Sequence, residues 1–99
     1  MKISVPHHTT RENARRIVEQ RLADLQRQYD KQADDFDANW SGDTLHIAAK
    51  ARGIHMKGTV EITDSEVVID GKLPLIAMPF ESRIRSTVEK EAESMFRTA

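Results

Sequence analysis

The sequence contains no cysteine among its 99 residues. This excludes disulfides, thiol chemistry and cysteine-ligated zinc sites, and it fits a reducing compartment. Glycine and proline are scarce, with four and three residues, and aromatic residues make up 5%. The few glycines are scattered, so there is no phosphate-binding loop and no Gly-x-Ser-x-Gly nucleophile elbow. We therefore expect no cofactor and no enzymatic activity.

Long apolar runs and a net charge of one sign are also missing. No stretch approaches the ~20 apolar residues of a membrane span, and residues 1–8 lack the apolar run of a secretory signal. Fifteen basic and sixteen acidic residues leave a net charge of −1. Such a chain has no overall field that attracts nucleic acid or an anionic membrane. We expect a cytoplasmic protein without a nucleic-acid partner.

What is present is typical of one small folded domain. The chain has the length of a single domain and shows no repeat, linker or low-complexity segment. Apolar residues make up 38% and charged residues 31%, which indicates a thin core under a well-charged surface. We expect residues 1–99 to form a single α+β domain.

Two stretches have the 3.6-residue period of an amphipathic helix. The first, residues 10–31, follows a Thr9-x-x-Glu12 capping-box pattern, and the second, residues 79–97, starts at a proline suited to the first helical position. The expected buried stripes are Ala14, Ile17, Val18, Leu22, Leu25 and Tyr29, and then Phe80, Ile84, Val88, Ala92, Met95 and Phe96. Arg11 and Arg15 fall on the solvated side of the first helix.

Elsewhere the apolar residues alternate with polar ones, which predicts strands that are buried on one face. A short strand is expected at residues 2–6, and four more at residues 36–41, 45–49, 54–62 and 67–73. The turns between these four fall at residues 41–43, 52–53 and 63–66. Successive strands with short turns form an antiparallel meander. Because both helices need the apolar face of the sheet, we predict a two-layer α+β sandwich, β-α-β-β-β-β-α, with a mainly antiparallel sheet and two helices on one face.

Four histidines, His7, His8, His46 and His55, raise the question of a metal site. His46 and His55 fall on neighbouring strands and on the polar face, where they could approach each other across the hairpin. No His-x-His or His-x-x-x-His pair is present, and a metal needs further ligands. We therefore predict no metal site and expect surface histidines, with His7 or His8 helping to close the strand-to-helix turn.

The polar face of the sheet is a candidate contact surface, represented by His46, His55 and Lys57. It has mixed charge and no aromatic residue. RNA-binding sheets stack bases on exposed aromatic rings, so nucleic-acid binding is not expected here. Self-association through this face or through a sheet edge, giving a homodimer, stays open.

Several short motifs resemble the polyhydroxyalkanoic acid system protein family, small bacterial proteins named for polyester-granule gene regions. They are residues 40–45 (WSGDTL) and 58–62 (GTVEI), with Asp64 in the next turn. His7 or His8 before the first helix and Ala14 within it also match. The resemblance covers nearly the whole chain. It implies polyhydroxyalkanoate granules or granule proteins as partners, and it supplies no reaction and no catalytic residues.

The connector at residues 73–80 (LPLIAMPF) is apolar where a surface loop is expected. We favour a plug that closes the open end of the sandwich, with Phe80 beginning the core stripe of the second helix. The alternative is a hydrophobic contact surface for a granule, an acyl ligand or a partner chain. Its residues would be Leu75, Ile76, Met78 and Phe80. Both can hold together, with Leu75 buried and Ile76 or Met78 exposed.

The sequence thus favours a small non-catalytic accessory or interaction protein linked to polyhydroxyalkanoate granule metabolism. The alternative is a small-molecule binder that takes an acyl or lipid-like ligand in a pocket between helices and sheet. Gly58 and Gly71 motivate the alternative, because both are expected to face inward and their missing side chains could leave a cavity.

Overall fold

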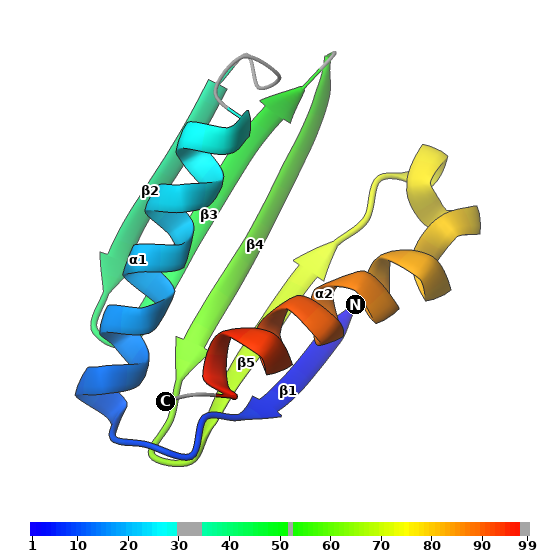
Figure 1. Cartoon of the computed structure of the whole chain (residues 1–99). Helices are drawn as coiled ribbons and strands as arrows, with labels where there is room; N and C mark the ends of the chain where they lie inside the picture. Colours follow the sequence, from blue (N-terminus) through cyan, green and yellow to red (C-terminus); the bar gives the residue numbers. More distant parts are fainter. Residues whose placement is uncertain (30–34, 52, 98–99) are drawn as a thin grey trace.

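The computed structural model describes residues 1–29, 35–51 and 53–97 (Figure 1). Its elements, in chain order, are β1 (Lys2–Pro6), α1 (Arg11–Tyr29), β2 (Asp35–Ser41), β3 (Thr44–Ala51), β4 (Ile54–Ile62), β5 (Glu66–Lys72), the 3₁₀ helix η1 (Leu75–Phe80) and α2 (Glu81–Phe96). This order confirms the predicted α+β sequence of elements and adds a 3₁₀ helix before the last helix. The expected end of the first helix at Lys31 and the turn residue Arg52 lie outside the described residues.

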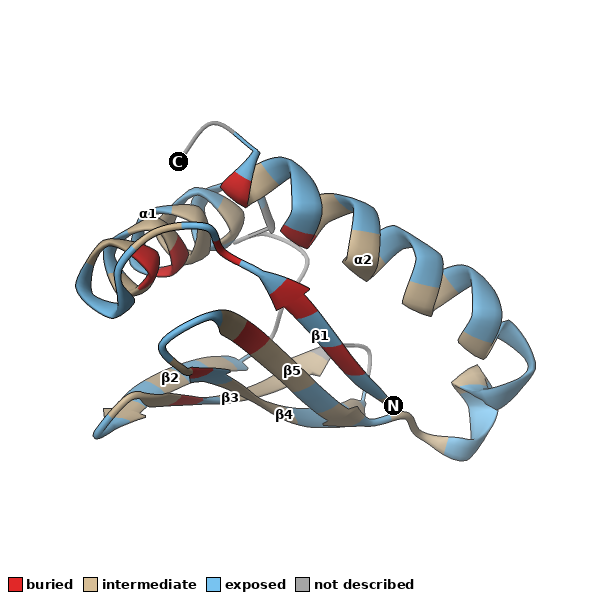
Figure 2. Ribbon diagram, turned by 90° about the horizontal axis from the view of Figure 1, so that it is seen from below, coloured by how far each residue is buried: buried red, intermediate tan, exposed pale blue. Residues whose placement is uncertain are grey.

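The five strands form one sheet in the order β1-β5-β4-β3-β2, and every neighbouring pair is antiparallel. The last four strands form the predicted meander. The first strand joins it at β5, with Val5 opposite Val67, so β1 and β2 form the two edges. Both helices lie on the same face of the sheet (Figure 2), which confirms the predicted two-layer arrangement.

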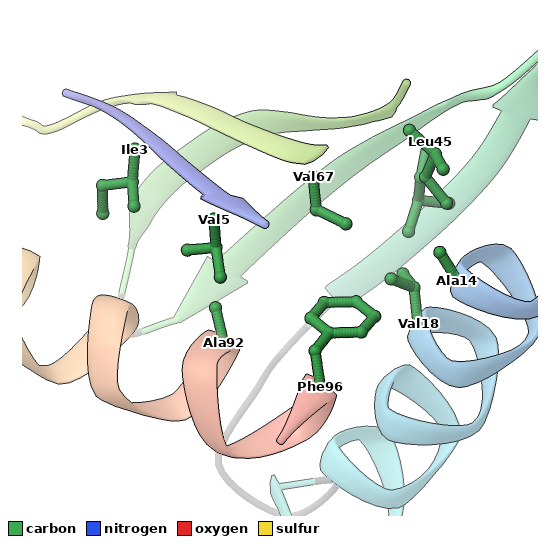
Figure 3. Packing of buried hydrophobic residues seen from close by; sticks show 9 residues of the cluster. Ile3, Val5, Ala14, Val18, Leu45, Val67, Ala92 and Phe96 are labelled. Atoms are coloured by element: carbon green, nitrogen blue, oxygen red, sulfur yellow. The ribbon is translucent and has the colours of Figure 1, made fainter. Parts of the chain in front are cut away.

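The core lies where the start of α1 and the end of α2 meet the sheet (Figure 3). Alternation along the strands buries Ile3, Val5, Leu45, Ile62 and Val67, and the helical stripes add Ala14, Val18, Ala92 and Phe96. The ring of Phe96 points between Val18 of α1 and Val5 of β1 (Figure 3). The end of α2 is therefore the place where both helices and the sheet share one apolar cluster.

The first helix is capped one residue later than the sequence pattern predicts. The backbone N–H of Asn13 donates to Oγ1 of Thr10 at 3.1 Å, which is the geometry of an N-cap. The side-chain amide of Asn13 donates to Oγ1 of Thr9 at 2.9 Å. Thr9 and Glu12 therefore do not form the predicted capping box, and α1 begins at Arg11.

The second helix also begins later than predicted, at Glu81, because Pro79 and Phe80 belong to η1. A 3₁₀ helix has three residues per turn and an α-helix 3.6. The apolar residues of η1 therefore do not continue the stripe of α2. Phe80 is exposed, so the prediction that it begins the core stripe is wrong.

Candidate functional site

The connector forms an exposed apolar surface, which we call the η1 patch. It consists of Leu75, Ile76, Met78 and Phe80, which are 85%, 70%, 48% and 55% exposed. The prediction that this segment plugs the sandwich is therefore wrong, and so is the expectation that Leu75 is buried. Pro74 is extended, with φ −63° and ψ 154°, and the chain runs past the end of β5 before η1 begins (Figure 1). The patch consequently stands away from the core.

A second apolar surface lies between the helices. α1 follows β2 and β3, whereas α2 crosses β1 and β5, so the two helices diverge over the middle of the sheet (Figure 1). An apolar cleft begins here in two adjoining parts: about 100 Å³ lined by both helices and the sheet, and about 250 Å³ lined by the sheet, Met1 and Val88 of α2. Both parts share Ile47, Val60 and Ile69 as their floor. The helix–sheet interface is thus not a closed core.

The glycine pair anticipated from the sequence lies in the larger part of this cleft. Gly58 and Gly71 stand directly opposite each other in β4 and β5, and Gly58 also pairs with Ile47 of β3. A Cβ atom built on Gly71 would lie 3.5 Å from the carbonyl oxygen of Lys57 and 3.9 Å from Cα of Gly58, which are ordinary contacts. A Cβ on Gly58 would come within 3.0 Å of the carbonyl oxygen of Asp70. Gly58 is therefore constrained by strand pairing, whereas the backbone around Gly71 has room for a Cβ atom in ordinary contact.

Arg21 is the one charged residue among the described residues that line the smaller part of the cleft. Its Nη2 forms an ion pair with Oε1 of Glu91, which joins α1 to α2. Its Nε is buried and has no hydrogen-bond partner among the described residues. A buried donor without an acceptor is unfavourable, and this nitrogen has almost no accessible surface, so neighbouring atoms and not a ligand surround it.

His7 is buried at the junction of β1 and α1 and has a structural role. The backbone N–H of Thr9 donates to Nδ1 at 3.2 Å, and Nε2 lies 2.9 Å from the carbonyl oxygen of Thr63. Since Nδ1 accepts, the proton of the neutral ring sits on Nε2 and is donated to Thr63. The expectation of a surface histidine is wrong for His7, and its expected place in the strand-to-helix turn is confirmed.

Comparison with known proteins identifies the family. The model of the family described as "Putative polyhydroxyalkanoic acid system protein (PHA_gran_rgn)" matches residues 1–96. The chain belongs to the polyhydroxyalkanoic acid system protein family. No curated protein and no solved structure matches it.

In this member of the polyhydroxyalkanoic acid system family, two arginines gather the motif residues at one end of the sheet. Arg11 pairs with Asp43 at 2.6 Å and with Asp64 at 2.8 Å, which ties the start of α1 to two hairpin turns. The hydrogen bond to Asp43 is the main cause of a raised pKa for Arg11. The guanidinium of Arg15 lies 4.2 Å from the ring centre of Trp40 and covers its face. These contacts join α1 to the hairpin turns and to β2 at the protein surface.

Sequence reasoning missed both arginines because they occupy the helix face expected to be solvated. Their acidic and aromatic partners lie far along the chain, in turns and strands whose position beside α1 depends on the tertiary fold. One feature of the sequence could have indicated the contacts of Arg11: Asp43 and Asp64 each fall in a predicted turn of the same sheet. Alternate turns of a meander lie at the same end of the sheet, so both acids can reach one cation.

The polar face of the sheet does not bring the two candidate histidines together. His46 stands opposite Thr59 and His55 opposite Lys50. They share a face but are four residues apart along it, or about 13 Å, so the prediction that they approach each other is wrong. Lys57 stands opposite Lys72. Within the described residues, no group of three His, Asp or Glu side chains could hold a metal ion.

Neither helix of the described chain is both long enough and apolar enough to span a membrane. Two apolar surfaces stand out among the described residues. One is the η1 patch and the other is the cleft between α1 and α2.

Proposed function

We propose that this protein is a non-catalytic accessory protein that associates with polyhydroxyalkanoate granules in the bacterial cytoplasm through the η1 patch. Family membership supports the link to polyhydroxyalkanoate. The observation that carries the proposal is the exposure of four large apolar side chains on one six-residue segment. Contiguous exposed apolar surface is costly in water and usually marks a binding surface.

The chemistry of the patch suits an apolar polymer surface. The patch carries no charge, and its 3₁₀ backbone turns are closed internally, with the N–H of Ala77 bonded to the carbonyl oxygen of Pro74 at 2.9 Å. The backbone of the segment is therefore already ordered, so binding costs little further backbone entropy. Full burial of a large apolar side chain contributes about 1.5–3 kcal/mol, so a few of them suffice for adsorption to a polyester surface.

The test is sedimentation of the purified protein with polyhydroxyalkanoate particles. We expect the double variant Ile76→Ser with Met78→Ser to bind at least about tenfold more weakly, because it removes apolar contact area. Its melting temperature should match that of the wild type, because both side chains are exposed. The control is Met56→Ser, one of the two changes made at an exposed methionine of β4 that lines the cleft and lies outside the patch, and it should leave particle binding unchanged.

Equal particle binding by the double variant and the wild type would overturn the proposed role of the patch. The proposed lack of catalytic activity is tested with the same samples. Particles incubated with the protein should release no more hydroxy acid than particles alone, and a sustained release would contradict an accessory role.

A further inference from the structure

All six residues of η1 are apolar, and the segment stands at one end of the molecule. It joins the end of β5 to the start of α2, which is the end of α2 remote from the core (Figure 2). None of its residues is buried, whereas α2 buries Ala92 and Phe96 near its other end. The fold therefore holds η1 away from its own apolar interior.

The 3₁₀ geometry distributes these side chains around the whole segment. Side chains three residues apart lie above one another in a 3₁₀ helix. The segment therefore has three faces, formed by Leu75 with Met78, Ile76 with Pro79, and Ala77 with Phe80. Leu75, Ile76 and Phe80, one on each face, are all more than half exposed. An element that is apolar on all sides is normally surrounded by an apolar medium.

This arrangement distinguishes lying on a surface from entering it. A flat surface covers one face of such a segment and the flanks of the other two, so it leaves apolar side chains in water. Immersion in an apolar phase covers all three faces. At a rise of about 2.0 Å per residue, η1 is about 12 Å long, which is comparable with the roughly 5–10 Å to which interfacial segments enter an apolar layer.

The backbone of η1 suits an apolar surrounding. Polar backbone groups need internal partners where water is excluded. The N–H of Ala77 donates to the carbonyl oxygen of Pro74 at 2.9 Å, and the N–H of Glu81 donates to that of Met78. Pro79 has no N–H that needs a partner. These donors therefore do not depend on water.

Polar residues at both ends of η1 limit how far it enters. They are Lys72 before the segment and Glu81, Ser82 and Arg83 after it. Two cations and one anion fall short of the roughly four to eight basic residues that are typical of segments binding anionic lipid head groups. The segment therefore suits an apolar phase without charged head groups.

The state of that phase follows from the space that an entering segment needs. Organic crystals fill about 0.74 of their volume and simple organic liquids about 0.5–0.6. A liquid-like polyester has mobile chains that close around an entering segment, whereas a crystalline polyester has fixed ones. We propose that η1 inserts with all three faces into the amorphous, liquid-like phase of a polyester granule. This inference rests on the proposed granule contact and names the state of its partner.

The first test uses the absence of cysteine from the chain. Three single-cysteine variants, Leu75→Cys, Ile76→Cys and Phe80→Cys, carry an environment-sensitive dye on one face each. The matched control is Ser82→Cys, at an exposed polar residue just after the segment. With saturating amorphous particles, the dyes on all three faces should become at least about fivefold less accessible to aqueous iodide. The dye at position 82 should stay accessible.

The second test compares two states of the same polyester. At equal particle surface area, the wild type should bind amorphous particles at least about tenfold more tightly than crystalline ones, because only the amorphous phase covers all three faces. Leu75→Ser, Ile76→Ser and Phe80→Ser should each weaken binding to amorphous particles at least about fivefold. Because all three side chains are exposed, these variants should melt at the wild-type temperature.

Insertion is overturned if the chain binds amorphous particles while the dye on one face keeps its accessibility to iodide, or if one of the serine variants binds as well as the wild type. Equal binding to amorphous and crystalline particles overturns the proposed phase. Tighter binding to vesicles of anionic phospholipid than to amorphous particles overturns the choice of partner.

The failure of insertion and the failure of the granule contact are distinguishable. A dye that stays accessible on one face leaves the granule contact intact and excludes immersion. Equal particle binding by the wild type and by Ile76→Ser with Met78→Ser removes the η1 patch from granule binding, and it overturns both proposals.

Discussion

His7 shows how one polar side chain joins segments that are distant in sequence. Its ring accepts from the N–H of Thr9 and donates to the carbonyl of Thr63, which is 56 residues away. The ring also lies 6.3 Å from that of Phe96, at an angle of 53°. A histidine before a helix predicts a local turn contact, and that much follows from the sequence. Its burial depends on the position of the β4–β5 turn, which no local pattern gives.

Replacing His7 by phenylalanine tests this role. His7→Phe keeps a ring of similar shape but leaves the Thr9 N–H and the Thr63 carbonyl without partners, so we expect a loss of about 2 kcal/mol in the free energy of unfolding. Urea denaturation measures it. The control is His46→Phe, at an exposed histidine of β3, which should change stability by less than about 0.5 kcal/mol. Equal stability of His7→Phe and wild type would rule out the hydrogen-bonding role.

At the scale of elements, the periodicity of apolar residues predicts the sheet and both helices, but it does not predict the residues at which the helices begin. The alternation of apolar and polar residues from Phe36 onward identifies four strands. It also fixes which side chains face the helices, since a slip of one residue would turn every apolar side chain to solvent. The 3₁₀ helix was not predictable, because LPLIAMPF has no period that distinguishes a plug from an exposed turn. The cleft was only partly predictable. Gly58 and Gly71 indicated missing side chains, but the divergence of α1 and α2 is a property of packing.

The two phenylalanines of the last helical region provide a prediction at this scale. Phe96 at the end of α2 is buried between both helices and the sheet, whereas Phe80 at its start is exposed. Phe96→Ala should therefore lower the free energy of unfolding by about 3–5 kcal/mol, which is a large part of the stability of a domain this size. Phe80→Ala should cost less than about 0.5 kcal/mol. Thermal or urea unfolding of the two variants measures this difference in stability. Equal losses in the free energy of unfolding would mean that α2 is anchored at both ends.

At the scale of the whole molecule, the sheet has two open edges that could join copies of the chain. The β2 edge carries Asp35 and Asp37 at alternate positions, and the β1 edge carries Lys2 and Pro6. Charged residues and proline are the usual means of preventing edge-to-edge pairing. The edges are therefore poor surfaces for self-association, which leaves the two apolar surfaces as better candidates for contacts.

This view predicts what happens when the charge on one edge is removed. Asp35→Thr with Asp37→Thr keeps strand propensity but leaves β2 uncharged, so we expect the light-scattering mass to rise with concentration while the wild type stays at one chain. The control, Glu61→Thr with Asp70→Thr, makes the same change in net charge on the exposed face of two central strands. Because central strands have no free backbone groups to pair, it should stay monomeric. If both double variants associate equally, net charge rather than edge protection keeps the chains apart. If neither associates, the acidic residues of β2 are not what protects that edge.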